Sequence, residues 1–283
     1  MQSFDLFQAI TLIKIAVSIA MVVVLSVLAE VVSPRFAGVL SGYPLGAAIS
    51  LFFFGYELSP GFAAESALYT SVGLAATQTF AYIYYRVSAR AASLNKLPNI
   101  LAATSAALCG YFLVAAVLQQ IKLNLAIAIA LPALSIVLFV ALFRKVANVK
   151  IEQRVSLNHR VVLLRSLAAA FFIVVITSTA KAVGQRWAGL FSAFPITMLP
   201  FVIIIHITYD PAHVYAVLKN VPKGIGSLVV YAFAVHLLYP TCGIYLGTLL
   251  AYVLATIYLL LLHFKESTPW ILSLLKSKKT PMS

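Results

Sequence analysis

A ten-residue motif that occurs twice constrains this chain more than any other feature. Residues 35–44 read Arg-Phe-Ala-Gly-Val-Leu-Ser-Gly-Tyr-Pro, and residues 186–195 read Arg-Trp-Ala-Gly-Leu-Phe-Ser-Ala-Phe-Pro. The two copies lie 151 residues apart (186 minus 35), and the same offset relates residues on both sides of the motif. These further pairs are Lys14 with Arg165, Ala29 with Ala180, Glu30 with Lys181, Val32 with Val183, Pro60 with Pro211, Gly73 with Gly224 and Ala81 with Ala232. Ungapped agreement over this span indicates two copies of one unit.

The composition places both copies in a membrane. Hydrophobic residues make up 63% of the 283 residues and charged residues only 10%, which is too apolar for a soluble domain of this length. Several apolar runs reach the roughly 20 residues that a helix needs to cross a bilayer. We therefore predict an all-α polytopic membrane protein with about nine transmembrane helices. They are expected near 9–32, 36–56, 63–85, 97–119, 122–143, 161–183, 187–209, 213–239 and 243–263.

The net charge of +13 reflects membrane topology and not nucleic-acid binding. The basic residues occupy connectors that alternate with connectors poor in Lys and Arg, as the positive-inside rule requires. The basic segments contain Arg86, Arg90 and Lys96; Arg144, Lys145, Lys150, Arg154, Arg160 and Arg165; Lys219 and Lys223; and the tail Lys276, Lys278 and Lys279. This alternation predicts an outer N-terminus and a cytoplasmic C-terminus, and the bacterial inner membrane is the expected location.

An odd number of helices before the second copy would invert it. The expected units are a four-helix repeat over residues 1–119, a linker helix with a basic cytoplasmic loop over 120–160, an inverted four-helix repeat over 161–264 and a basic tail over 265–283. This four-plus-one-plus-four inverted repeat is typical of secondary transporters, whose halves rock around a site at their interface.

The second motif resembles a run in the GlpM family of small four-helix bacterial inner-membrane proteins. The run is Trp-Ala-Gly-Leu-Phe-Ser-Ala-Phe-Pro over residues 187–195, at the start of an expected helix. The resemblance implies two GlpM-like units fused in one chain, but it implies no defined activity. More distantly, the layout is similar to the drug/metabolite transporter superfamily, in which four-helix units work as antiparallel pairs.

The small residues and prolines of the motif are candidates for lining a transport path. Proline removes a backbone donor and kinks a helix, which frees carbonyl groups that survive in a membrane only inside protein or beside a cavity. The candidates are Arg35, Gly38, Ser41 and Pro44 in the first copy and Arg186, Gly189, Ser192 and Pro195 in the second. Close helix packing with a structural kink is the alternative for the small residues, and contact with lipid phosphates is the alternative for the arginines.

Other polar residues within or beside the expected helices are candidates for a gate or for proton coupling. They are Glu30, Arg165, Lys181, Gln78, His206 and His236. If Glu30 is buried, we expect its partner to be Arg165 or Arg35. The spacing of His206, Asp210 and His213 is not that of a metal site, and no cofactor motif or catalytic motif is present.

The sequence favours a secondary transporter of a small polar or anionic metabolite and not an enzyme. The alternative is a membrane factor in envelope or exopolysaccharide biogenesis that acts by interaction or by handling lipid. A central cavity ringed by polar side chains would favour transport. The expected partners are the lipid bilayer, an unidentified small molecule and a second copy of the chain in a homodimer.

Overall fold

The computed structural model describes residues 9–21, 23, 43–147 and 159–277, and every regular element within them is helical. A first helix, Ala9–Met21, precedes the labelled elements. The labelled elements are α3 (Gly46–Glu57), α4 (Pro60–Arg90), α5 (Lys96–Leu118), α6 (Leu125–Leu142), the 3-10 turn η1 (Phe143–Lys145), α7 (His159–Ser192), α8 (Met198–Thr208) and α9 (Pro211–Ser277). The all-α prediction is confirmed for these residues.

The long apolar helices are compatible with a membrane protein. Four stretches within the described residues are long and apolar enough to span a bilayer, namely Lys96–Leu118, Leu125–Lys145, Val162–Ser192 and Pro211–Leu262. Large hydrophobic side chains on these helices point away from the bundle, among them Leu113, Leu134, Phe171 and Leu261. Apolar outer faces of this extent are compatible with lipid and not with water.

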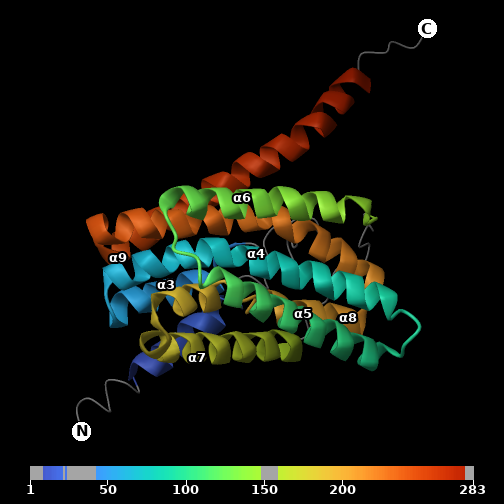
Figure 1. The fold of residues 1–283 in the computed structure, drawn as a ribbon. Coiled ribbons are helices and arrows are strands. Elements are labelled where there is room, and N and C mark those ends of the chain that lie inside the picture. The colour runs from blue at the N-terminus through green and yellow to red at the C-terminus, as the bar shows by residue number, and fades with distance from the viewer. Residues whose placement is uncertain (1–8, 22, 24–42, 148–158, 278–283) are drawn as a thin grey trace.

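α4 forms the centre of the bundle and contacts α3, α5, α6, α7 and α9 (Figure 1). Its start is well defined, because Pro60 occupies the first turn and the Ser59 hydroxyl accepts a hydrogen bond from the backbone N–H of Phe62. Its buried residues are mainly Ala, Gly, Ser and Thr, which allow neighbouring helix backbones to approach closely. The molecule is therefore held together around one helix that is rich in small side chains.

Two glycines break the longest helices. Gly184 in α7 and Gly243 in α9 have φ of 77° and 74°, a left-handed region that favours glycine. Each of these helices is therefore two helical segments joined at a sharp change of direction. The break at Gly243 falls within the Pro-Thr-Cys-Gly run over 240–243, where the sequence predicts a division.

The second motif breaks its helix completely, whereas the sequence predicts only a kink. α7 ends at Ser192 and α8 begins at Met198, so a single continuous helix over 187–209 is wrong. Pro195 lies in the middle of this non-helical stretch and cannot donate to a helix. At the first motif, a bend over residues 43–45 likewise precedes α3.

Contacts between helix ends show that α4 and the first segment of α9 run antiparallel. The carbonyl of Ala64, near the start of α4, lies 3.0 Å from the Nδ1 of His236, late in that segment. At the other end of α4, the hydroxyls of Ser88 and Tyr215 lie 3.0 Å apart. Lys96, at the start of α5, donates to the carbonyl of Ile207, so α8 ends beside the connector that follows α4.

Candidate functional site

A cavity of about 40 Å³ lies where the two motifs meet. Its walls come from the bend before α3 and the start of α3, the break between α7 and α8, the middle of α4, and the first segment of α9. Ten of the lining residues form pairs at the 151-residue offset: Tyr43 with Phe194, Gly46 with Thr197, Ala47 with Met198, Leu74 with Ile225, and Thr77 with Leu228. The cavity is thus lined by equivalent positions of both copies, as expected for a site on an axis that relates them.

The carbonyl groups at the end of α7 accept hydrogen bonds from hydroxyl groups of neighbouring helices. Thr70 in α4 donates to the carbonyl of Gly189 at 3.0 Å, and Thr77 donates to that of Ala193. Tyr111, buried in α5, donates to the carbonyl of Leu190. The sequence predicts freed carbonyls near the proline, but not that α4 and α5 would supply their donors.

The backbone donors at the starts of α3 and α8 have no such side-chain partners. Neither Leu45 nor Thr197, the residues preceding these helices, makes a side-chain capping bond. By contrast, the Asn124 side chain caps α6 by accepting from the N–H of Ile127. The first turns of α3 and α8 begin at the cavity, because Gly46, Ala47, Thr197 and Met198 line it. Two uncapped helix N-termini therefore face the same small space.

Ser192 and Pro195 of the second motif line the cavity. The Ser192 side chain is 2% exposed, and its hydroxyl has no hydrogen-bond partner within the described part of the chain. Pro44, the described proline of the first motif, is buried next to the cavity, and its carbonyl accepts a hydrogen bond from Tyr252 at 3.3 Å. These residues lie where a path between the copies would run.

Gly189 packs against α4 and is not among the cavity-lining residues. A Cβ at this position would lie 2.1 Å from the carbonyl oxygen of Ser66 and 2.7 Å from the Cβ of Tyr69. Only glycine allows the α7 and α4 backbones to approach this closely. Gly189 therefore serves close packing between helices, which was the alternative to lining a path. Ser192, which lines the cavity, fits the interpretation as a path residue.

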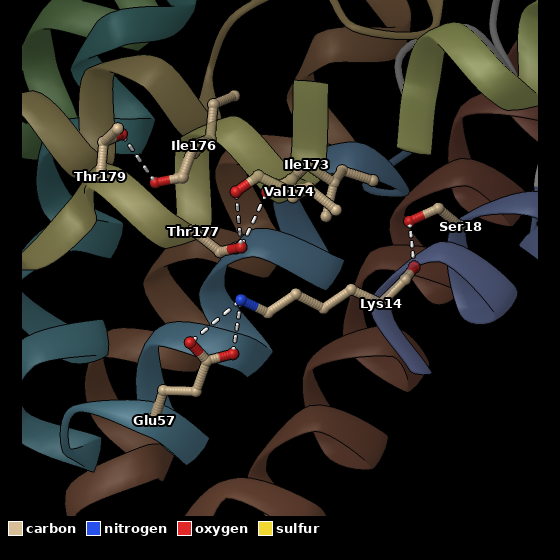
Figure 2. Close-up of polar contacts among 8 residues, drawn as sticks. All are labelled: Lys14, Ser18, Glu57, Ile173, Val174, Ile176, Thr177 and Thr179. Carbon is tan, nitrogen blue, oxygen red and sulfur yellow. Dashed lines mark hydrogen bonds and ion pairs between the residues drawn. The ribbon is translucent and has the colours of Figure 1, made fainter. Parts of the chain in front are cut away.

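An ion pair joins Lys14 of the first helix to Glu57 at the end of α3 (Figure 2). The Lys14 Nζ lies 2.7 Å and 3.0 Å from the two carboxylate oxygens, and it also lies 5.5 Å from the centre of the Phe53 ring. The Lys14 side chain is 1% exposed and that of Glu57 is 22% exposed. The candidate residues from the sequence did not include this pair. The sequence does contain one signal for this pair. Lys14 lies within an apolar segment, and the predicted topology places it at the same depth in the membrane as the connector after residue 56, which begins with Glu57.

Of the other described candidate residues, all but Lys181 make contacts between helices away from the cavity. Arg186 donates to the carbonyl of Gln119 at 3.1 Å and so caps the end of α5, and Gln78 donates to the hydroxyl of Ser135 at 2.8 Å. The Nδ1 of buried His206 lies 2.9 Å from the Tyr84 hydroxyl. His236 contacts the carbonyl of Ala64 as described above, and Lys181 is exposed on α7. The described residues contain no group of three or more His, Cys, Asp or Glu that could hold a metal ion.

Several predicted residues lie outside the described part of the chain. They are Glu30, Arg35, Gly38 and Ser41, together with the side chain of Arg165. The expected contacts of Glu30 with Arg165 or Arg35 stay predictions.

Comparison with protein-family models, with curated proteins and with solved structures finds no match for the chain. The resemblance to the GlpM family stays a prediction. The function is therefore inferred from the geometry around the cavity.

Proposed function

We propose that the protein is a secondary transporter of a small polar or anionic metabolite that works by alternating access between two inverted repeats. The observation that carries this proposal is the cavity lined by equivalent positions of both copies, Tyr43 with Phe194 and Thr77 with Leu228 among them. Transporters built from inverted repeats bind substrate at such an interface, where helices are discontinuous. The lining includes the hydroxyl-bearing residues Tyr43, Thr77, Ser192 and Thr197, which offer polar contacts in a mainly apolar wall.

The proposed architecture has about nine spans in a four-plus-one-plus-four arrangement, with the N-terminus outside and the C-terminus in the cytoplasm. Two features support inversion. The equivalent segments Pro60–Arg90 and 211–241 run antiparallel. The short helices α3 and α8 each follow a motif proline, α3 beginning two residues after Pro44 and α8 three residues after Pro195. In this view α6 is the additional crossing between the copies. Two GlpM-like units would each supply one half of the path.

A cavity of about 40 Å³ has room for a few atoms and suits an occluded form. Transport would require the copies to rock about the contact between α3 and the α7–α8 break. Gly46 lies at this contact, since a Cβ there would lie 3.3 Å from the Cδ1 of Ile196. A larger side chain at residue 46 would fill the cavity from one wall.

Lipid handling is the second candidate function, and a lateral cavity favours it. This cavity of about 330 Å³ lies between the first helix, α3 and α9, and its lining includes Ile13, Val17 and Phe52. The lining is almost entirely apolar, which suits an acyl chain. Among the described residues, no basic side chain lines it to bind a lipid phosphate, so this cavity supports the candidate less strongly.

Counterflow in proteoliposomes tests transport. We expect vesicles preloaded with a panel of unlabelled monocarboxylates, amino acids and sugars to accumulate at least one matching radiolabelled solute. Gly46→Leu, which fills the cavity, is expected to reduce this uptake at least tenfold. Gly61→Leu is the matched control, because the nearest atom to a Cβ at residue 61 is the Ser59 hydroxyl at 4.0 Å.

Uptake that Gly46→Leu leaves unchanged would contradict a path through the cavity. The same vesicles also carry a fluorescent phospholipid. Transfer of this lipid between leaflets, without counterflow of any solute, would favour the second candidate function.

A further inference from the structure

We propose that the cavity between the motifs binds a small monovalent anion through backbone N–H groups at the starts of α3 and α8 and through the hydroxyl of Ser192. This inference rests on the proposed function and narrows its substrate class from polar or anionic solutes to monoanions. It assigns anion binding to these groups and not to Arg186, whose guanidinium caps α5.

The chemistry of the broken helices favours a ligand that accepts hydrogen bonds. The freed carbonyls of Gly189, Leu190 and Ala193 already have donors from α4 and α5. Leu45 and Thr197, which precede α3 and α8, provide no side-chain cap, and the Ser192 hydroxyl has no partner in the described residues. In the first turn of α8 the Leu199 N–H bonds the Pro195 carbonyl and Pro200 has no N–H, so Met198 supplies the remaining donor of that turn. Donors are therefore in excess at the cavity, and a ligand rich in acceptors balances them.

The charge of the site matches one negative charge. A helix N-terminus carries the equivalent of roughly +0.5 elementary charge, so the two N-termini together offset about one anionic charge. The described residues that line the cavity include no Asp, Glu, Lys or Arg. A dianion would be left half-neutralised in a water-poor interior, and a cation would be repelled by both helix ends.

The acidic group on α3 lies far from this site. Glu57 is the last residue of α3, about 17 Å along the helix from Gly46, and it is neutralised by Lys14. The carboxylate therefore does not oppose an anion at the other end of the helix. The cavity volume restricts the occluded ligand to the size of formate or a halide ion, and larger monoanions would need a wider form.

A binding experiment that compares formate with formamide distinguishes the effect of the negative charge from the effect of molecular shape. We measure the thermal unfolding midpoint of the full-length protein in detergent at constant ionic strength, with sodium gluconate as the balancing salt. Formate is expected to raise the midpoint saturably, because it binds the folded state, and the neutral isostere formamide is expected not to do so. Equal effects of the two compounds would overturn the proposal.

Two pairs of variants locate the binding site. Ser192→Ala removes the unpaired hydroxyl and is expected to weaken the apparent formate affinity about tenfold, whereas Ser178→Ala removes an exposed hydroxyl of the same helix and leaves the affinity unchanged. Thr197→Asp places a tethered carboxylate at the start of α8 and is expected to abolish the formate response. Thr208→Asp places the same group at the exposed far end of α8 and is expected to retain it.

Wild-type affinity in Ser192→Ala, or a formate response that persists in Thr197→Asp, would overturn the site. Radiolabelled formate flux in proteoliposomes distinguishes this failure from failure of the proposed function. Formate binding without flux would retain the anion site and contradict transport of this anion. Counterflow of a neutral solute by a protein that shows no formate response would retain transport and contradict the anion site.

Discussion

Replacing Glu57 by glutamine is expected to lower the free energy of unfolding by about 3 kcal/mol. The change removes the negative charge of the carboxylate whose two oxygens lie 2.7 Å and 3.0 Å from the Lys14 ammonium, and leaves that ammonium buried without a counter-charge. The Lys14 side chain is 1% exposed, so water cannot replace the lost partner without disturbing the packing of the first helix. SDS-driven unfolding of the purified protein in mixed micelles measures this loss.

Substitution of the lysine of this pair is expected to lower the free energy of unfolding by less. Lys14→Met leaves Glu57 without its partner, but that side chain is 22% exposed at the end of α3 and can be hydrated. The methionine also keeps an apolar stem beside Phe53. The double variant Lys14→Met/Glu57→Gln removes both charges and is expected to be more stable than Glu57→Gln alone.

A double-mutant cycle with these three variants therefore has a defined order of stability. Equal losses from the two single variants, or no coupling between them, would show that the pair is a solvated surface contact. A double variant as unstable as Glu57→Gln would contradict the proposed cost of leaving Lys14 buried and unpaired.

Gly189→Ala is expected to destabilise the protein by about 3 kcal/mol or to prevent folding. The added methyl group would lie 2.1 Å from the Ser66 carbonyl oxygen, a backbone atom that cannot rotate away. α7 would have to move away from α4, and the hydrogen bond from Thr70 to the Gly189 carbonyl would lengthen. Folded yield and the SDS unfolding midpoint are the measurements.

Gly61→Ala is the matched control, because residue 61 lies in the first turn of α4 and is exposed. Its stability is expected to stay within about 0.5 kcal/mol of wild type. Similar behaviour of Gly189→Ala and Gly61→Ala would contradict the close contact between α7 and α4.

The sequence predicts the helical class and the place of most helix boundaries, because apolar length and charged connectors are local signals. The repeat also predicts that Pro44 and Pro195 occupy corresponding places, each at a kink in its helix. It does not predict that the helix carrying Pro195 is fully interrupted over residues 193–197, because the extent of unwinding depends on partners for the freed backbone groups. Those partners, Thr70, Thr77 and Tyr111, come from other helices and form no motif.

The candidate site could be predicted only in part for the same reason. A sequence motif draws attention to charged residues such as Arg186, but in the fold this side chain caps α5. The two features that define the cavity are an unpaired hydroxyl at Ser192 and missing side-chain caps at Leu45 and Thr197. Both depend on which groups lack neighbours, and this is known only when the helices are packed.

Cysteine labelling at equivalent connectors tests most directly whether the two copies have opposite orientations. Ser59 and Asp210 are both exposed, precede α4 and α9 respectively, and are related by the 151-residue offset. In a background that lacks Cys109 and Cys242, a membrane-impermeant maleimide is expected to label Ser59→Cys from outside and Asp210→Cys from the cytoplasmic side. Labelling of both positions from the same side would contradict the inverted repeat and the shared cavity built on it.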